Sequence, residues 1–384
     1  MKIEEPPMAD PVTLHQSEVR DKPVIVYAVS GQGRGHAAKS VALYEELIGD
    51  YEVRFLAGGE AYDFFIKKGL PVIEIPALRF EHRNSAIYLP GTIKINLPHF
   101  LRWRKIMSQI SSHLKKLNPV LVISDFEAFV PRVARKLKIP VLQISHQVVL
   151  VSCRYAVPLR QWYSYLKAFF TSKMIIGRFD RAIGVSFFPV PIRGRKNRDK
   201  VEVLPPALRK ELLDRRDTPR EKRHILTYFS CTQFSWVAEI LAKYPEEHFV
   251  IYGPAPEEQP DHPNITYKNI SPNTFLEDLL QAKAVITNGG HNFISEAYFL
   301  GLPIMSFSVR GQFEQFLNAW FVEHMGLGRM VERFQDTETV LQAFLADLEA
   351  GQDGPPKVLA SGNQIISGQI ADWHNEFAKT ASRA

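Results

Sequence analysis

The sequence contains only two cysteines, Cys153 and Cys231, in 384 residues, which excludes a disulfide framework and a cysteine-based metal site. This scarcity is typical of proteins from a reducing compartment, so we expect a cytoplasmic protein, with a peripheral position at the inner face of a membrane as an extension of that expectation. No stretch reaches the roughly 18 unbroken apolar residues that a membrane span needs. Residues 1–22 lack the apolar centre of a signal peptide, and we expect them to form a flexible leader.

Acidic residues are in the minority, because 41 Asp and Glu face 47 Lys and Arg and leave a net charge of +6. The basic residues cluster at 102–105, at 115–116 and at 193–200. Solvated surfaces explain such clusters, and so does an anionic partner such as a phosphate, a lipid headgroup or a nucleic acid. Nucleic-acid binding would rest on the charge and on no other feature, so we expect no nucleic-acid partner.

Apolar strands alternate with helices along most of the chain. The strand predicted at 23–30 is a nearly continuous apolar run, which suits a strand buried on both faces of a parallel sheet. The alternation ends in a charged linker at 206–223 and then begins again. We therefore predict two Rossmann-like, doubly wound parallel-sheet domains, at 23–205 and 224–363. The helix predicted at 364–384 has no strand after it, and we expect it to pack back on the first domain.

The first candidate site is the loop after the first strand, Gly31-Gln32-Gly33-Arg34-Gly35-His36. Ligands of open α/β sheets bind at the carboxyl ends of strands, where glycines let backbone N–H groups approach a phosphate or a sugar. We assign Gly31, Gly33, Arg34 and Gly35 to a phosphate or acceptor loop, and His36 to the role of general base. The loop does not end in the Gly-Lys-Ser/Thr of a P-loop. Its third glycine comes one residue too early for the Gly-x-Gly-x-x-Gly dinucleotide fingerprint.

Further polar residues follow the later strands of the first half. Asp125 and Glu127 come after the strand predicted at 120–124, and His146 ends the next strand. Because the carboxyl ends of parallel strands share one edge of a sheet, Asp125 could orient His36 or act as the base itself. Capping of the loop entry is the alternative interpretation of each of these residues.

The second candidate site, from Thr287 to Ala297, has the order strand, glycine turn, helix. Backbone amides at 290–292 would lie at a helix N-terminus, which suits a diphosphate. Glu296 could accept hydrogen bonds from two ribose hydroxyls, and it needs a partner if it is buried in this otherwise apolar helix. Glu314-Gln315 opens the next helix and could read sugar hydroxyls, although the helix dipole alone favours an acid there.

The run 286–328 resembles the donor-binding signature of GT-B glycosyltransferases. Glu296-Ala297, Gly301-x-Pro303 and Glu314-Gln315-x-x-Asn318-Ala319 match the family's Glu-Ala, Gly-x-Pro and Asp-Gln-x-x-Asn-Ala elements in order and spacing. The loop with His36 and the segment Pro206-x-x-Arg209 resemble further elements of these enzymes, which include the peptidoglycan GlcNAc transferase and the UDP-glycosyltransferases. The resemblance implies the GT-B architecture, in which two Rossmann-like domains face each other across a cleft.

The resemblance also implies roles for single residues. Glu296 would bind the ribose, and His291 would replace a phosphate contact that these enzymes often make with a histidine where Asn288 stands. Two hydroxyl residues would help to hold phosphate, and the backbone of Ile270 would bind the base. The full set of implied donor-binding residues is Ser230, Thr232, Ile270, Asn288, Gly289, Gly290, His291, Asn292, Glu296, Glu314 and Gln315. No metal and no cofactor besides the nucleotide-sugar co-substrate are expected, since the family needs none and an Asp-x-Asp motif is absent.

These assignments predict an inverting transfer from a nucleotide sugar, with UDP as the expected nucleotide, to the hydroxyl of a glycan, a lipid-linked acceptor or a small molecule. Aromatic residues at 159–176 would face such an acceptor or a membrane surface, or would pack in a core. Two alternatives remain open. A sugar-nucleotide epimerase, similar to UDP-GlcNAc 2-epimerase, would convert the donor without an acceptor. A non-catalytic nucleotide-sugar-binding protein would bind the donor without turnover.

Overall fold

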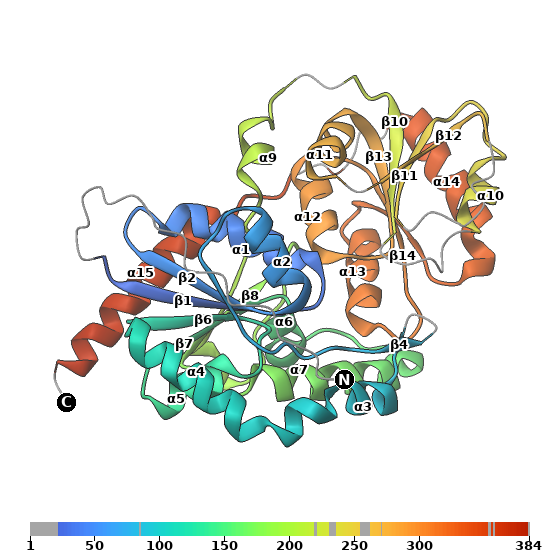
Figure 1. Cartoon of the computed structure of the whole chain (residues 1–384). Coiled ribbons are helices and arrows are strands. Elements are labelled where there is room, and N and C mark those ends of the chain that lie inside the picture. The colour runs from blue at the N-terminus through green and yellow to red at the C-terminus, as the bar shows by residue number, and fades with distance from the viewer. Residues whose placement is uncertain are drawn as a thin grey trace, which may run out of the picture.

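The computed structural model describes residues 22–83, 86–218, 221–229, 236–253, 262–269, 271–351, 355 and 358–382. They form two α/β domains, each built around a parallel sheet (Figure 1). This arrangement confirms the predicted fold class. Within the described part of the chain, no helix is both long enough and apolar enough to cross a membrane.

The first domain has a seven-stranded parallel sheet in the order β3-β2-β1-β6-β7-β8-β9. Every side chain from Ile25 to Val29 is fully buried, as expected of an apolar strand covered on both faces. The strands are β1 (Val24–Val29), β2 (Glu52–Ala57), β3 (Val72–Glu74), β6 (Leu121–Asp125), β7 (Val141–Ser145), β8 (Arg181–Val185) and β9 (Val201–Leu204).

Helices cover both faces of this sheet because alternate residues of β1 point to opposite sides. Ile25 and Tyr27 pack in one cluster with α1 (Arg34–Leu47), whereas Val26 packs in another with α4 (Trp103–Leu117). The other helices that follow these strands are α2 (Gly59–Lys67), α5 (Val130–Lys136), α6 (Gln147–Ser152), α7 (Trp162–Ile176), which a 3-10 turn at Leu159–Gln161 precedes, and α8 (Arg195–Arg198).

Two elements of the first domain were not predicted. A short hairpin, β4 (His82–Arg83) and β5 (Ala86–Ile87), leads into α3 (Leu89–Leu101), which ends just before α4 begins. The prolines and the glycine in α3 are poor helix formers, so the sequence pattern did not indicate a helix there. Asn96 of α3 bonds both to the N–H and to the carbonyl of Arg79, at 3.0 and 2.6 Å, and so fixes the preceding loop.

The second domain has a six-stranded parallel sheet in the order β12-β11-β10-β13-β14-β15. Its strands are β10 (His224–Tyr228), β11 (Phe249–Tyr252), β12 (Ile265–Lys268), β13 (Ala282–Thr287), β14 (Ile304–Phe307) and β15 (Gly328–Val331). Its helices are α10 (Val237–Leu241), α11 (Pro272–Gln281), α12 (His291–Phe299), α13 (Phe313–His324) and α14 (Thr337–Glu349). The predicted pattern stopped at α13, so β15 and α14 are additions to it.

The chain crosses twice between the domains. The first crossing contains a short helix, α9 (Lys210–Asp214), within the stretch predicted as a linker. The second leads to α15 (Asn363–Ala381), which packs against α1, and the side chains of Ile366, Ile370 and Trp373 lie in the core of the first domain. The amide side chain of Asn363 ties the two crossings together, since it bonds both to the N–H and to the carbonyl of Leu208.

Strand order fixes where a ligand can bind. In each sheet the order reverses between two neighbouring strands, β1 and β6 in the first domain and β10 and β13 in the second. Ligands of doubly wound sheets bind beyond the carboxyl ends of the strands at such a reversal. Both candidate sites from the sequence follow these strands.

Candidate active site

His36 and Asp125 come together at the strand reversal of the first domain. The N–H of Ser30, just after β1, donates to the carbonyl of Asp125 at the end of β6, so the two strand ends are joined. His36 lies in the first turn of α1, and its Nδ1 is 2.8 Å from Oδ1 of the fully buried Asp125. A bond at Nδ1 leaves Nε2 as the ring nitrogen that can take a proton.

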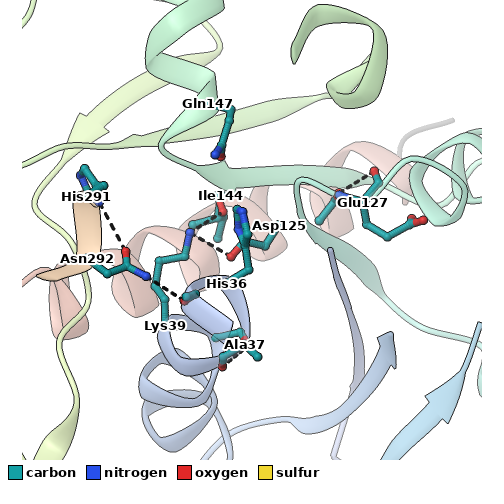
Figure 2. Close-up of polar contacts among 12 residues, drawn as sticks. His36, Ala37, Lys39, Asp125, Glu127, Ile144, Gln147, His291 and Asn292 are labelled. Carbon is teal, nitrogen blue, oxygen red and sulfur yellow. Dashed lines mark hydrogen bonds and ion pairs between the residues drawn. The ribbon is translucent and has the colours of Figure 1, made fainter. Parts of the chain in front are cut away.

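Lys39 completes this group, and the sequence analysis did not assign it. It lies on α1 one turn after His36, is almost fully buried, and its Nζ is 2.9 Å from the other carboxylate oxygen of Asp125 (Figure 2). Burial, the largest influence, acts to raise the pKa of Asp125, but Lys39 and His36 together hold that pKa below its usual range. Asp125 is therefore an ionised carboxylate between two donors at neutral pH.

The second candidate site lies at the start of α12. The helix begins at His291 with Gly290 as its N-cap, so its free backbone N–H groups are at 290–292, as the sequence predicted. Gly289 before it has φ +79°, and a Cβ there would lie 2.7 Å from the carbonyl oxygen of Gln315. The backbone can take this course only because residue 289 is glycine.

The two candidate sites are in direct contact across the domain junction. The Asn292 side chain, in the first turn of α12, donates to the carbonyl of Gly35 at 2.8 Å (Figure 2). Gly35 immediately precedes His36 in α1. The start of the second-domain helix therefore lies one residue from the histidine of the first domain.

Two histidines stack across the same junction. The rings of His146, at the N-terminus of α6, and His291 have their centres 3.9 Å apart, and both side chains are buried. Burial lowers the pKa of both, and the neighbouring His146 lowers the pKa of His291 further. His146 also bonds through Nδ1 to the carbonyl of Val185 at 2.8 Å. The pair is therefore neutral at pH 7 and closes the junction by packing.

Glu296 has the partner that its burial requires. Arg209, just before α9, donates to both oxygens of the Glu296 carboxylate, at 2.7 and 2.9 Å. In the sequence, Arg209 stands out only as the last residue of the segment Pro206-x-x-Arg209. Each carboxylate oxygen has two acceptor sites, so this two-pronged pair does not use the full acceptor capacity of Glu296.

Glu314 at the start of α13 is also held from the other domain. Gln147, the residue after His146, donates from Nε2 to a Glu314 carboxylate oxygen at 3.1 Å. Gln147 was not a candidate, because only the packing of the two domains brings α6 to α13. The neighbouring Gln315 is partly buried, and its Oε1 has no hydrogen-bond partner among the described residues.

Glu127 serves as a helix cap. Its carboxylate accepts the N–H groups of Phe129 and Val130, at 2.8 and 2.7 Å, where α5 begins. Burial raises the pKa of Glu127 to about 7 despite these bonds. This arrangement corresponds to the capping interpretation, and it leaves Asp125 as the acid that contacts His36.

A small pocket is lined in part by Phe126, whose ring stacks on His36 with the ring centres 5.9 Å apart. Ile75, Ala77, Leu78 and Phe80 form one wall, and Ile175 of α7 belongs to the lining. Gly31 forms part of the lining, and a Cβ there would lie 2.3 Å from that of Ala77. All the residues that line this pocket belong to the first domain.

Comparison with known proteins identifies the family of the chain. Residues 23–349 match the model of the family described as glycosyl transferase family 1. The chain belongs to this family. It is a sugar-transferring enzyme, as the sequence resemblance predicted.

Relatives of this glycosyltransferase agree with that assignment. An uncharacterized glycosyltransferase of Methanosarcina acetivorans is 28% identical over 350 residues, which cover 85% of this chain and 90% of that protein. Acinetobacter baumannii MurG has a TM-score of 0.56 at 16% identity, over 91% of this chain and 99% of that one. UGT71G1 of Medicago truncatula, solved with UDP-glucose, has a TM-score of 0.58 at 12% identity, over 92% and 98%. At such low identities the two solved structures show the shared fold.

Some assigned residues of this glycosyltransferase fall beyond the described structure. Ser230, Thr232 and Ile270 lie outside the described residues, as does the side chain of Arg34. Asn288 is described and buried at the end of β13. The roles assigned to all these residues stay predictions.

Proposed function

We propose that this glycosyltransferase moves a sugar from a nucleoside-diphosphate donor, with UDP as the nucleotide, to an acceptor hydroxyl in one inverting displacement that needs no metal ion. The observation that carries this proposal is the contact of two half-sites. The His36–Asp125 pair in the first domain lies one residue from the bond between Gly35 and Asn292, at the start of α12.

The second domain binds the donor in this proposal. Free N–H groups at the start of α12 receive the diphosphate, because a helix N-terminus carries partial positive charge and open donors. Glu296 accepts the ribose hydroxyls while Arg209 holds it in place. Glu314, held by Gln147, is positioned to accept a hydroxyl of the donor sugar.

The first domain supplies the base. Nε2 of His36 takes the proton of the acceptor hydroxyl, and that oxygen attacks the anomeric carbon as the bond from carbon to the phosphate oxygen breaks. The ionised Asp125 stabilises the imidazolium that forms, and the diphosphate leaves with the bonding electrons at the start of α12. A single displacement on the face opposite the leaving group inverts the anomeric centre.

A donor screen by thermal unfolding tests this proposal. A ligand that binds only the folded chain at about 100 times its Kd adds about 2.7 kcal/mol of stability. UDP and at least one UDP-sugar should raise Tm, whereas free sugars and nucleosides should not. No rise with any nucleoside diphosphate or nucleotide sugar would reject the proposal.

Product analysis separates transfer from the other two activities that the sequence left open. Incubation of the donor alone would give an isomerised sugar nucleotide with an epimerase and unchanged donor with a binding protein. The family match and the named relatives give the epimerase no support. A transferase releases UDP only when an acceptor or water takes the sugar.

A further inference from the structure

Charge is distributed unevenly along the chain, and the excess positive charge belongs to one part of the first domain. Residues 82–179 contain 16 of the 47 Lys and Arg residues but only two of the 41 Asp and Glu residues, namely Asp125 and Glu127. Both of these acids are buried and bonded. This segment has a formal charge of +14, whereas the whole chain has +6, so the remaining residues are net acidic.

The same segment contains most of the large exposed apolar side chains of the described residues. On α3 the side chains of Ile93, Leu97 and Leu101 recur at helical spacing, and Leu101 is 79% exposed. On α7 and the turn before it, the exposed apolar side chains are Leu159, Trp162, Tyr163, Leu166, Phe170 and Met174, with Phe170 62% exposed. A monomeric protein rarely exposes so many large apolar groups on two helices without a partner.

Basic side chains lie among these apolar groups. Exposed ones include Lys94, Arg102, Arg104, Lys105 and Lys173, and α3, α4 and α7 contain no acidic residue. Arg160, in the turn before α7, is also exposed, and it pairs with Glu332. Figure 1 shows α3 and α7 along the same lower side of the first domain. This combination of apolar and basic groups is complementary to an anionic lipid surface, which takes up apolar side chains and attracts Lys and Arg. A nucleic acid would use the charge but not the aliphatic side chains.

The small pocket against Phe126 is lined by a residue of α7, and α3 is linked to it through Arg79. Ile175 of α7 forms part of the pocket lining, together with Leu78 and Phe80. Asn96 of α3 holds Arg79, which lies between these two pocket residues. The face formed by α3 and α7 therefore lies near Phe126, the pocket residue that stacks on the proposed base His36.

We propose that the face of α3 and α7 binds the surface of an anionic lipid bilayer, and that the enzyme takes an amphiphilic acceptor from it. The bilayer binding stands on the exposed side chains and the charge, whereas the acceptor class rests on the proposed glycosyl transfer.

Vesicle co-sedimentation of the full chain tests this. Wild-type protein should sediment with phosphatidylcholine vesicles that contain phosphatidylglycerol, and only weakly with phosphatidylcholine alone. The double substitution Leu101→Ser and Phe170→Ser should lower the partition coefficient at least about tenfold, because it removes two exposed apolar anchors. The matched control is Ile66→Ser, since Ile66 is 53% exposed on α2 and lies outside this face. This control should bind like the wild type.

The outcomes separate this inference from the proposed function. Loss of vesicle binding in the double variant, with its Tm rise on UDP-sugar retained, supports the inference in a folded protein. Absence of binding to anionic vesicles, equal binding by the double variant, or binding of RNA in preference to vesicles would overturn it. Vesicle binding without any donor effect on Tm would leave the bilayer surface standing and reject the transfer reaction.

Discussion

Nδ1 of His36 lies 2.8 Å from Oδ1 of Asp125, although 89 residues separate the two in the chain. The pairing follows from strand order, because β1 and β6 are neighbours in the sheet and both residues lie at or just beyond the carboxyl ends of these strands. The histidine is supplied by a helix and the acid by a strand, so the geometry of their bond depends on the rigid core of the first domain.

Substitution of His36 should separate catalysis from donor binding. We expect His36→Ala to lower kcat about 10²–10⁴-fold, the usual contribution of a general base, and to leave the donor Kd within about threefold of wild type. Steady-state kinetics and a donor titration measure the two quantities. His99→Ala is a control, since it removes a histidine of α3 that contacts Phe129 and lies outside this pair. A fully active His36→Ala enzyme would reject the base role.

Lys39 should set the pH range in which the pair works. Without Lys39, burial is opposed only by His36 and the pKa of Asp125 rises, so Lys39→Met should move the acid limb of the kcat profile to higher pH. The variant also leaves a buried carboxylate half-paired, which should lower the free energy of unfolding.

A double variant provides the control for Lys39. Lys39→Met combined with Asp125→Asn removes both buried charges, so its free energy of unfolding should exceed that of Lys39→Met alone. If Lys39→Met has a wild-type pH profile, Lys39 has no effect on the ionisation of the pair.

The Arg209–Glu296 pair should govern donor affinity. Glu296→Gln keeps the shape but loses the charge, so we expect the donor KM to rise about tenfold or more, because a hydrogen bond to a charged group contributes about 1.5–3 kcal/mol. Arg209→Met frees the carboxylate and should raise the donor KM by a smaller factor, through loss of position. An unchanged KM in Glu296→Gln would remove the ribose assignment.

The stacked histidines should make the domain junction sensitive to acid. The folded-state pKa of both rings is lowered, so between that pKa and about 6.5 the unfolded chain binds more protons than the folded chain. Their contribution to the free energy of unfolding is therefore complete above about pH 6.5. It is lost as the pH falls, by up to about 1.4 kcal/mol per pH unit for each ring. Lys39 and His36 oppose protonation of His291, whereas Glu314 favours protonation of His146.

His291→Phe tests this, since it retains an aromatic ring for the stack and cannot titrate. Denaturant unfolding from pH 7.5 to 5 should show a shallower loss of stability in the variant than in the wild type. Parallel curves for the two proteins would contradict the neutral state of the buried pair.

The sequence predicted the fold well where a strand was buried on both faces, as in β1, because such a strand is a continuous apolar run. It failed at α3, because the prolines and the glycine of that segment are poor helix formers. At the site, the residues on one strand end or one helix start were foreseen. Lys39, Gln147 and the partner role of Arg209 were not, because their contacts depend on how helices and domains pack, which leaves no local pattern.

A structure of the enzyme with UDP bound is the most direct test of the account. We expect phosphate oxygens about 3 Å from the backbone nitrogens at 290–292, the usual hydrogen-bond distance, and ribose hydroxyls on the Glu296 carboxylate. A diphosphate bound away from the start of α12, or a Glu296 that contacts only Arg209 in the complex, would contradict it.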